Sequence, residues 1–370
     1  MTNGGSRGGR LVRASLRDLS LVQIRHVERT RYGSARGPAA RIYREVERDF
    51  GILAPPIALH APAPAAMAAS WLMVRETMLV PGLVERAAKE AVAAAVSVAN
   101  SCPFCVTMHT ATLDSLLPGA CGAAIAADRL RQVADEPIRA LGTWARTGTH
   151  RPPANSGPRP FPPEQAPELV GAAVALHYLN RMVNVFLGDR PLPPGAPAAM
   201  LRPVTRVLVA LLRGGAERVG EPGASLELLP DAPAPADLGW AAGAPAIAAA
   251  FARAAACLDT AAEAVVPDAV RALVRTELAD WDGRPLPLDS GWITRALAAV
   301  PEGERGAGRL ALLVALASYR VDDEVVAAFR CYREDDRALL ETAAWAALAA
   351  AREAGTRLAA SADAAANAGS

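Results

Sequence analysis

Apolar positions recur with helical spacing along most of the chain, and no segment shows the sustained alternation that is typical of strands. Within residues 83–98 apolar residues fall at helical spacing, at Val84, Ala88, Ala91, Val92, Ala95 and Val98. Alanine and other strong helix formers dominate the sequence. The pattern therefore predicts an all-α fold in which residues 83–98 form a helix packed on one face.

Proline and glycine mark the segments between the expected helices. Proline is so dense in residues 150–165 that a helix is excluded there, and an extended loop is expected. A further helix is predicted from Ala166 to about Gly188, and an apolar segment follows at 204–212. Residues 214–237, rich in Gly, Pro and Ala, are the best candidate for a linker.

The helix of residues 83–98 should end close to residue 100. Asn100 and Ser101 are good capping residues, and Pro103 is tolerated only in a first helical turn. If the chain folds back here as a hairpin, Glu90 and His109 face each other, because they are symmetric about the Ala99–Asn100 position. In a straight helix the twelve residues from Glu90 to Cys102 would span about 18 Å.

Two thiols and an imidazole follow this break with a regular spacing. Cys102, Cys105 and His109 stand at i, i+3 and i+7, which places them on one face of a helix. A helix N-terminus, a nearby base and a second cysteine all favour the reactive thiolate. Positions i and i+3 lie about 5 Å apart, within the range of about 4.4–6.8 Å that a disulfide requires. The spacing indicates a redox dithiol.

At this point the chain resembles a known family. Glu90 followed by Cys102-x-x-Cys105-x-x-x-His109 is similar to the signature of the alkylhydroperoxidase D (AhpD)-like / carboxymuconolactone decarboxylase family. The flanking segments 42–56 and 178–188 are similar too, so that the resemblance covers about residues 35–195. It implies an all-α, AhpD-like helical bundle.

The resemblance also implies a chemistry. Relatives of the alkylhydroperoxidase type reduce peroxides, with Cys105 in the attacking position, Cys102 as its resolving partner, and Glu90 and His109 as a proton relay. No bound cofactor is expected, since an external dithiol donor of the dihydrolipoamide or thioredoxin type restores the thiols. Decarboxylase members lack the CxxC pair. One departure is Phe104, which occupies the place of a second histidine in the best-known relatives.

Other interpretations of the motif are considered beside a thiol-dependent peroxidase or disulfide reductase. The dithiol could switch the assembly of a non-catalytic, redox-sensing module, or Cys102, Cys105 and His109 could be three ligands of a zinc site. The isolated cysteines are expected to be small buried core residues: Cys121, Cys257 and Cys331. Of the isolated histidines, His177 is the one placed to approach the site.

Composition and charge exclude several classes of protein. The net charge is +1 and no face is strongly basic, so nucleic acid is not an expected partner. Apolar runs are interrupted by charges or prolines before the roughly 20 residues that a bilayer span requires, and no membrane association is expected. The N-terminal residues lack the apolar core of a secretion signal, and five cysteines with one close pair do not form a disulfide framework. A cytoplasmic location is expected.

The C-terminal part resembles a degenerate second copy of the first. Val266-Pro267-Asp268 leads into a helix much as Val80-Pro81-Gly82 does, but residues 281–290 contain no cysteine or histidine. A tandem of two AhpD-like domains is predicted, and a homo-oligomer is expected. The predicted boundaries are a flexible tail (1–30), a redox domain (31–200), a connecting segment (201–237), a degenerate helical domain (238–362) and a tail (363–370).

Overall fold

The computed structural model describes residues 17–151, 159–216, 219–287, 289 and 291–360, and these residues contain helices and no strand. The α-helices are α2 (Gly37–Phe50), α3 (Pro55–Ala58), α4 (Pro64–Val74), α5 (Arg86–Ala99), α6 (Pro103–Leu116), α7 (Cys121–Ala126), α8 (Glu136–Thr147), α9 (Ala166–Phe186), α10 (Leu201–Ala216), α11 (Pro245–Val265), α12 (Asp268–Asp280), α13 (Gly291–Ala296), α14 (Arg305–Ala317), α15 (Asp323–Tyr332) and α16 (Asp336–Ala360). A π-helical turn, η2 (Arg75–Leu79), continues α4.

Short 3-10 turns connect these helices. They are η1 (Tyr32–Ser34), η3 (Leu130–Gln132), η4 (Pro163–Gln165), η5 (Ala198–Met200), η6 (Leu226–Leu228), η7 (Ala236–Ala241), η8 (Leu297–Ala299), η9 (Glu302–Glu304) and η10 (Ser318–Arg320). The all-α fold is therefore confirmed. The helix expected at 83–98 runs from Arg86 to Ala99, and the one expected from Ala166 ends at Phe186.

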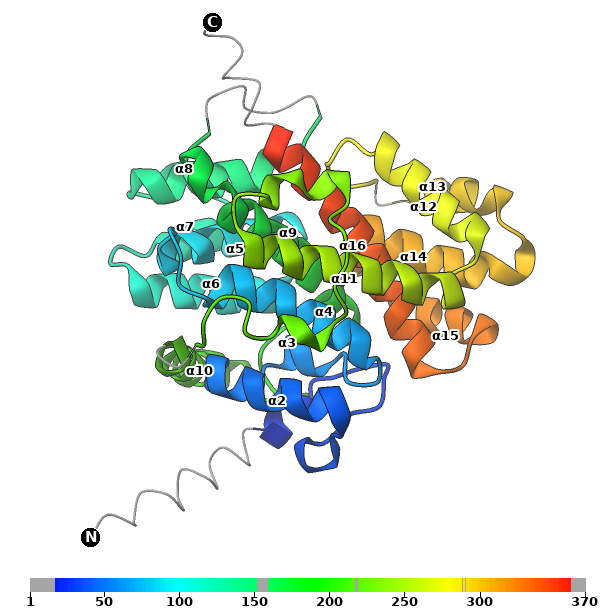
Figure 1. Cartoon of the computed structure of the whole chain (residues 1–370), viewed down its shortest axis with the longest axis horizontal. Coiled ribbons are helices and arrows are strands. Elements are labelled where there is room, and N and C mark those ends of the chain that lie inside the picture. Colours follow the sequence, from blue (N-terminus) through cyan, green and yellow to red (C-terminus); the bar gives the residue numbers. More distant parts are fainter. Residues whose placement is uncertain (1–16, 152–158, 217–218, 288, 290, 361–370) are drawn as a thin grey trace, which may run out of the picture.

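Two long helices, α9 and α16, pack against each other at the centre of the molecule (Figure 1). Helix α5 packs on α9 and carries α6, α7 and α8 on its other sides, while α14 packs on α16 and contacts α12 and α15. Helix α11 lies along both α4 and α16. We call α2–α10 the N-terminal half and α11–α16 the C-terminal half. The arrangement of α14 with α15 and α16 resembles that of α5 with α6 and α9, and the tandem origin of the two halves stays a prediction.

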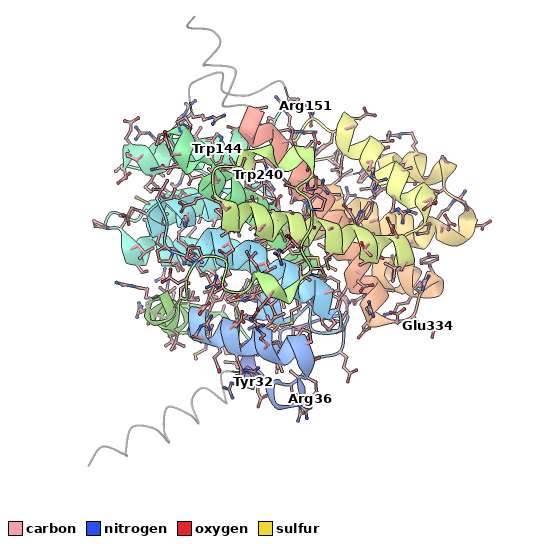
Figure 2. All side chains as sticks on the ribbon, in the orientation of Figure 1. Tyr32, Arg36, Trp144, Arg151, Trp240 and Glu334 are labelled. Carbon is pink, nitrogen blue, oxygen red and sulfur yellow. The ribbon has the colours of Figure 1, made fainter. Side chains whose placement is uncertain are left out.

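Glycines allow the central helices to approach closely. A Cβ atom on Gly355 of α16 would lie 2.5 Å from Cγ2 of Val174 on α9, and one on Gly171 would lie 2.7 Å from Cγ2 of Thr77. Trp240, labelled in Figure 2, meets Phe251 edge-on at 5.1 Å between ring centroids. Since real Cβ contacts are essentially never this short, a larger side chain at Gly355 would push α16 away from α9, and one at Gly171 would push η2 away from α9.

Helix α9 is a long apolar helix that is buried along nearly its whole length. By length and composition its segment Pro163–Phe186 is the one helix in the described residues that could cross a membrane, but 94% of its apolar window is buried inside the protein. Burial of this kind is what a central core helix shows. The apolar character of α9 therefore follows from its central position.

The chain joins the fold earlier than the sequence indicated. Residues 1–16 lie outside the described part, but Leu21 and Ile24, placed in the expected tail of residues 1–30, are buried in the core. The backbone N–H of Arg25 also donates to the carbonyl of Phe186, at 2.9 Å. The prediction of a tail up to residue 30 was wrong. Two apolar residues in a short segment give no periodic signal in the sequence, but in the structure they pack against a part of the core that is far away along the chain. The tail expected at 363–370 lies outside the described residues.

Candidate functional site

The site is built around the tight turn between α5 and α6. The backbone N–H of Ser101 donates to the carbonyl of Val98, and that of Cys102 donates to the carbonyl of Ser97, at 3.1 and 3.0 Å. This pair of bonds is the Schellman motif, which normally has glycine in the left-handed position. Here that position is held by Ser101, with φ of 50°. The turn ends α5 and places Cys102 at the N-cap of the next helix.

The two thiols of the dithiol differ in their surroundings. Cys102 is the N-cap of α6 and is fully buried, with Pro103 in the first turn, whereas Cys105 is 4% exposed. Burial raises the pKa of the Cys102 thiol well above its usual range, and the neighbouring Cys105 thiol adds to the rise. Both thiols are free in this structure. The Cys102 thiol is consequently held protonated beside a more accessible partner.

The hairpin brings Glu90 and His109 together. Nδ1 of His109 lies 2.7 Å from Oε2 of Glu90, although the two residues are nineteen positions apart. Arg86 contacts the other carboxylate oxygen, with its Nε 2.7 Å and its Nη2 2.6 Å from Oε1. The hairpin contact predicted from the sequence is confirmed. Arg86 was missed, although its position four residues before Glu90 on one helix is a local signal for an ion pair.

The electrostatics of this cluster fix the charge of Glu90. Its side chain is 1% exposed, and burial raises the pKa, but Arg86 and His109 together outweigh burial and lower it to about 2. A carboxylate that accepts a hydrogen bond from Nδ1–H leaves Nε2 of the neutral imidazole as a proton acceptor. Glu90 is therefore a permanent anion near neutral pH that orients His109.

Three further contacts fix the segment before α5 and the first turn of that helix. Nη1 of Arg86 donates to the carbonyl of Met78, in the π-helical turn, at 2.8 Å. Lys89, the single lysine of the chain, lies 2.7 Å from the carboxylate of Glu168. That carboxylate also accepts a 2.6 Å bond from the backbone N–H of Leu83. These contacts hold the first turn of α5, and with it Arg86 and Glu90, in a fixed position.

A cavity of about 120 Å³ opens beside Cys105 and His109. Its charged lining consists of Arg86, Glu90 and His109, and His109 is the only histidine among the residues that line it. Phe104 also lines the cavity. The best-known relatives in the family that the motif resembles have a second histidine at this position. The remaining lining is almost entirely apolar and comes from several elements: Phe50, Ile52, Ile57, Val74, Met78, Met108, Leu176, Leu179, Leu208 and Leu212. Cys102 is not part of this lining.

Helix α10 belongs to the segment that was expected to connect two domains. It packs against α2 and α6 and supplies Leu208 and Leu212 to the cavity wall. Farther along, the backbone carbonyl of Gly220 accepts a 2.8 Å bond from buried Arg75, and Ser225 donates to Glu45 at 2.7 Å. The segment therefore covers the site, a role that its composition did not indicate.

The remaining candidate residues lie elsewhere. His177 contacts Asn100 of the turn but does not line the cavity of Cys105. Of the isolated cysteines, Cys121 is buried as expected, Cys257 is half-buried and Cys331 is exposed. The expectation for the last two was wrong, because Cys257 and Cys331 lie outside the buried faces of α11 and α15. In the described residues no group of three or more His, Cys, Asp and Glu side chains is arranged to hold a metal ion.

The fold and the site define an all-helical protein with a CxxC dithiol and a carboxylate-bound histidine. The profile of the carboxymuconolactone decarboxylase family matches residues 64–114, which include the whole motif. A curated protein of Mycobacterium tuberculosis (strain ATCC 25618 / H37Rv), named alkyl hydroperoxide reductase, is 38% identical over 340 residues, which cover 92% of this chain and 96% of the relative. The chain belongs to the AhpD-like / carboxymuconolactone decarboxylase family.

Proposed function

We propose that the protein is a thiol-dependent peroxidase that reduces organic hydroperoxides with the Cys102/Cys105 dithiol. The observation that carries the proposal is the placement of the Cys105 thiol and the Glu90-bound His109 in one largely apolar cavity. The name of the Mycobacterium relative supports peroxide as the substrate. The apolar lining favours an alkyl group on that peroxide, because burying apolar surface contributes about 25 cal/mol per Å².

The first step is attack by Cys105. Nε2 of His109 accepts the thiol proton, and the thiolate attacks one oxygen of the hydroperoxide. The O–O bond breaks, the proton goes to the leaving alkoxide, and the products are an alcohol and the sulfenic acid of Cys105. Glu90 stays ionised throughout and stabilises the positive charge that forms on His109.

The second step closes the disulfide. The sulfur of Cys102 attacks the sulfenic acid of Cys105, and water leaves. The raised pKa of Cys102 suits a resolving residue, because this thiol should stay protonated until the sulfenic acid has formed. An external dithiol of the dihydrolipoamide or thioredoxin type then reduces the bridge and is itself oxidised. We further propose that this cycle takes place in the cytoplasm, in a homo-oligomer.

The test is a count of free thiols after a sub-stoichiometric pulse of tert-butyl hydroperoxide, with the modified peptide mapped by mass. We expect the loss of two thiols to a Cys102–Cys105 bridge, and its reversal by dihydrolipoamide. The Cys102→Ser variant is the matched control, since it should still react but stop at the sulfenic acid of Cys105. The Cys105→Ser variant should not react.

Other outcomes would support the alternative functions. Unchanged thiols together with stoichiometric zinc in the purified protein would contradict the peroxidase and favour a metal site. A disulfide that forms only slowly but changes the oligomeric state would favour a redox-sensing module. Size-exclusion chromatography of the reduced and oxidised protein distinguishes this last case.

A further inference from the structure

A second cavity lies where the two halves of the molecule meet, beside the turn that precedes Cys102. It measures about 40 Å³. The turn contributes Asn100 and Ser101, helix α9 contributes His177 and Arg181, and the C-terminal half contributes Trp281 and Tyr319. No acidic side chain is among the residues that line it. None of its lining residues belongs to the cavity of Cys105 and His109.

Arg181 is a buried cation without an anionic partner. Its side chain is 3% exposed, and no carboxylate lies within 4 Å of it in the described part of the chain. Nε donates to the carbonyl of Ala315 at 3.0 Å, and Nη1 donates to the carbonyl of His177 and to Oδ1 of Asn100, at 2.8 and 3.1 Å. Among the described residues Nη2 has no hydrogen-bond partner. Burial lowers the pKa of Arg181 to about 10, so the group stays charged near neutral pH.

His177 adds an unpartnered N–H group. Its Nδ1 lies 3.3 Å from Nη1 of Arg181 and 3.1 Å from Nδ2 of Asn100, which both donate, and 3.2 Å from Oδ1 of Asn100, which already accepts from Nη1 of Arg181. With two donors directed at it, Nδ1 is assigned as an acceptor, and this assignment places the ring hydrogen on Nε2. Nε2 is fully buried and has no hydrogen-bond partner in the described structure. Burial and the adjacent Arg181 lower the pKa of His177, so the ring is neutral.

We propose that this cavity binds a small oxyanion of carboxylate size, with Arg181 and His177 as the donors. A buried guanidinium without a counter-ion and a buried N–H without an acceptor both require negative charge or lone pairs. One water molecule occupies about 10–15 Å³ of cavity volume. A cavity of about 40 Å³ therefore holds about three groups of the size of a water molecule. Acetate and bicarbonate are of this size, and exposed Ser101 and Tyr319 at the rim leave a way in from solvent.

A bound anion would connect the two halves through the network of Arg181. That side chain already joins Asn100, the C-cap of α5, to the carbonyl of Ala315 on α14. A bound anion would neutralise the charge of Arg181 and so remove the free-energy cost of burying an unpaired guanidinium between the two halves. We therefore expect anion binding to stabilise the folded protein.

The experiment measures Tm while sodium acetate, and separately sodium bicarbonate, replaces the larger anion isethionate at constant ionic strength. We expect a saturable rise of roughly 3–4 °C at about 100 times the dissociation constant. His177→Asn keeps a hydrogen-bonding group near the position of Nδ1 but removes Nε2–H, and it should weaken the response at least tenfold. His150→Asn, the same substitution outside the cavity, should respond like the wild type.

A second variant narrows the cavity from the other side. Ala317→Val should reduce the space available without changing either donor, and it should also weaken the acetate response. If His177→Asn does not fold, the Ala317→Val result decides alone. An equal rise in all variants would mean a general salt effect, and no saturable rise in the wild type with either anion would overturn the proposal.

Discussion

The substitution Glu90→Gln tests how the site activates its thiol. Oε2 of Glu90 binds His109 and Oε1 binds Arg86, and the pKa of the carboxyl falls from 4.5 to about 2. A pKa difference of about 2.5, at about 1.36 kcal/mol for each pKa unit, corresponds to about 3 kcal/mol in favour of the ionised form. That free energy is present above pH 4.5 and is lost as the pH falls through 2.

The same carboxylate should stabilise the positive charge that the proposed mechanism places on His109 in the transition state. Replacing the carboxylate by an amide removes this positioned partner, and losing such a group typically costs about 10²-fold in rate. The amide introduced by Glu90→Gln can also donate to Nδ1 and trap the wrong tautomer of His109. Arg86 shares the carboxylate, but its side chain is 28% exposed, so water can solvate it in the variant.

The assay is the rate of Cys105 oxidation by tert-butyl hydroperoxide, followed by stopped-flow under single-turnover conditions. The matched control is Glu45→Gln, which removes another buried carboxylate that accepts bonds from Trp71 and Ser225. Glu45→Gln should lower stability but leave the rate within about twofold, whereas Glu90→Gln should lose about 10²-fold. A Glu90→Gln variant with the wild-type rate would refute the role of the carboxylate in charging His109.

Three further changes test the fold around the site. The left-handed φ of Ser101 costs a non-glycine residue about 1–2 kcal/mol. In urea unfolding, Ser101→Gly should therefore leave the free energy of unfolding unchanged or raise it by up to about 1 kcal/mol. Ser101→Val should lower the free energy of unfolding. Gly355→Ala should lower the free energy of unfolding by about 1–3 kcal/mol, since the added Cβ would meet Val174. Gly33→Ala is the control, because a Cβ at Gly33 meets no atom within 4 Å, and it should change the free energy of unfolding little. Equal effects of the two substitutions would contradict the close packing of α9 on α16. Burial lowers the pKa of His60 to about 4, so between pH 6.5 and 4 the unfolded chain binds a proton at His60 that the folded protein does not bind. The free energy of unfolding should therefore fall by about 3 kcal/mol over this pH range. His60→Phe should reduce this dependence of the free energy of unfolding on pH.

The hairpin could be predicted from the sequence because its determinants are local. Pro103, in the first turn of α6, fixes the place of the break, and symmetry about the turn then fixes the pairing of Glu90 with His109. Asn100 and Ser101 also lie at the break, but as the C-cap of α5 and the residue after it, and the N-cap of α6 is Cys102. The wall formed by Leu208 and Leu212 could not be predicted in the same way. Their helix shows an ordinary amphipathic pattern, and only the three-dimensional fold brings it across α2 and α6.

Helix α9 illustrates the same limit more sharply. Its apolar sequence indicates a core helix and nothing about which neighbour each face meets. The structure directs Leu176 and Leu179 to the cavity of Cys105, while His177 and Arg181 line the cavity at the junction of the halves. At about 100° per residue, positions 176 and 179 share one face and positions 177 and 181 share another. The acceptor for Nε of Arg181 is supplied by Ala315, which is 134 residues away, and no local pattern in α9 contains that information.

Helix α9 therefore lines both cavities, with one face toward each of them. Asn100, held by Arg181 through its side chain, also accepts a 3.0 Å bond at its backbone carbonyl from Nδ2 of Asn184, one turn farther along α9. Asn100 is followed directly by the strained Ser101 and by Cys102. The position of Cys102, the proposed resolving cysteine, is thus set by the same contacts that enclose the junction cavity. An occupant of that cavity should consequently affect the closing of the disulfide more than the attack by Cys105, whose pocket is formed by the opposite face of the helix.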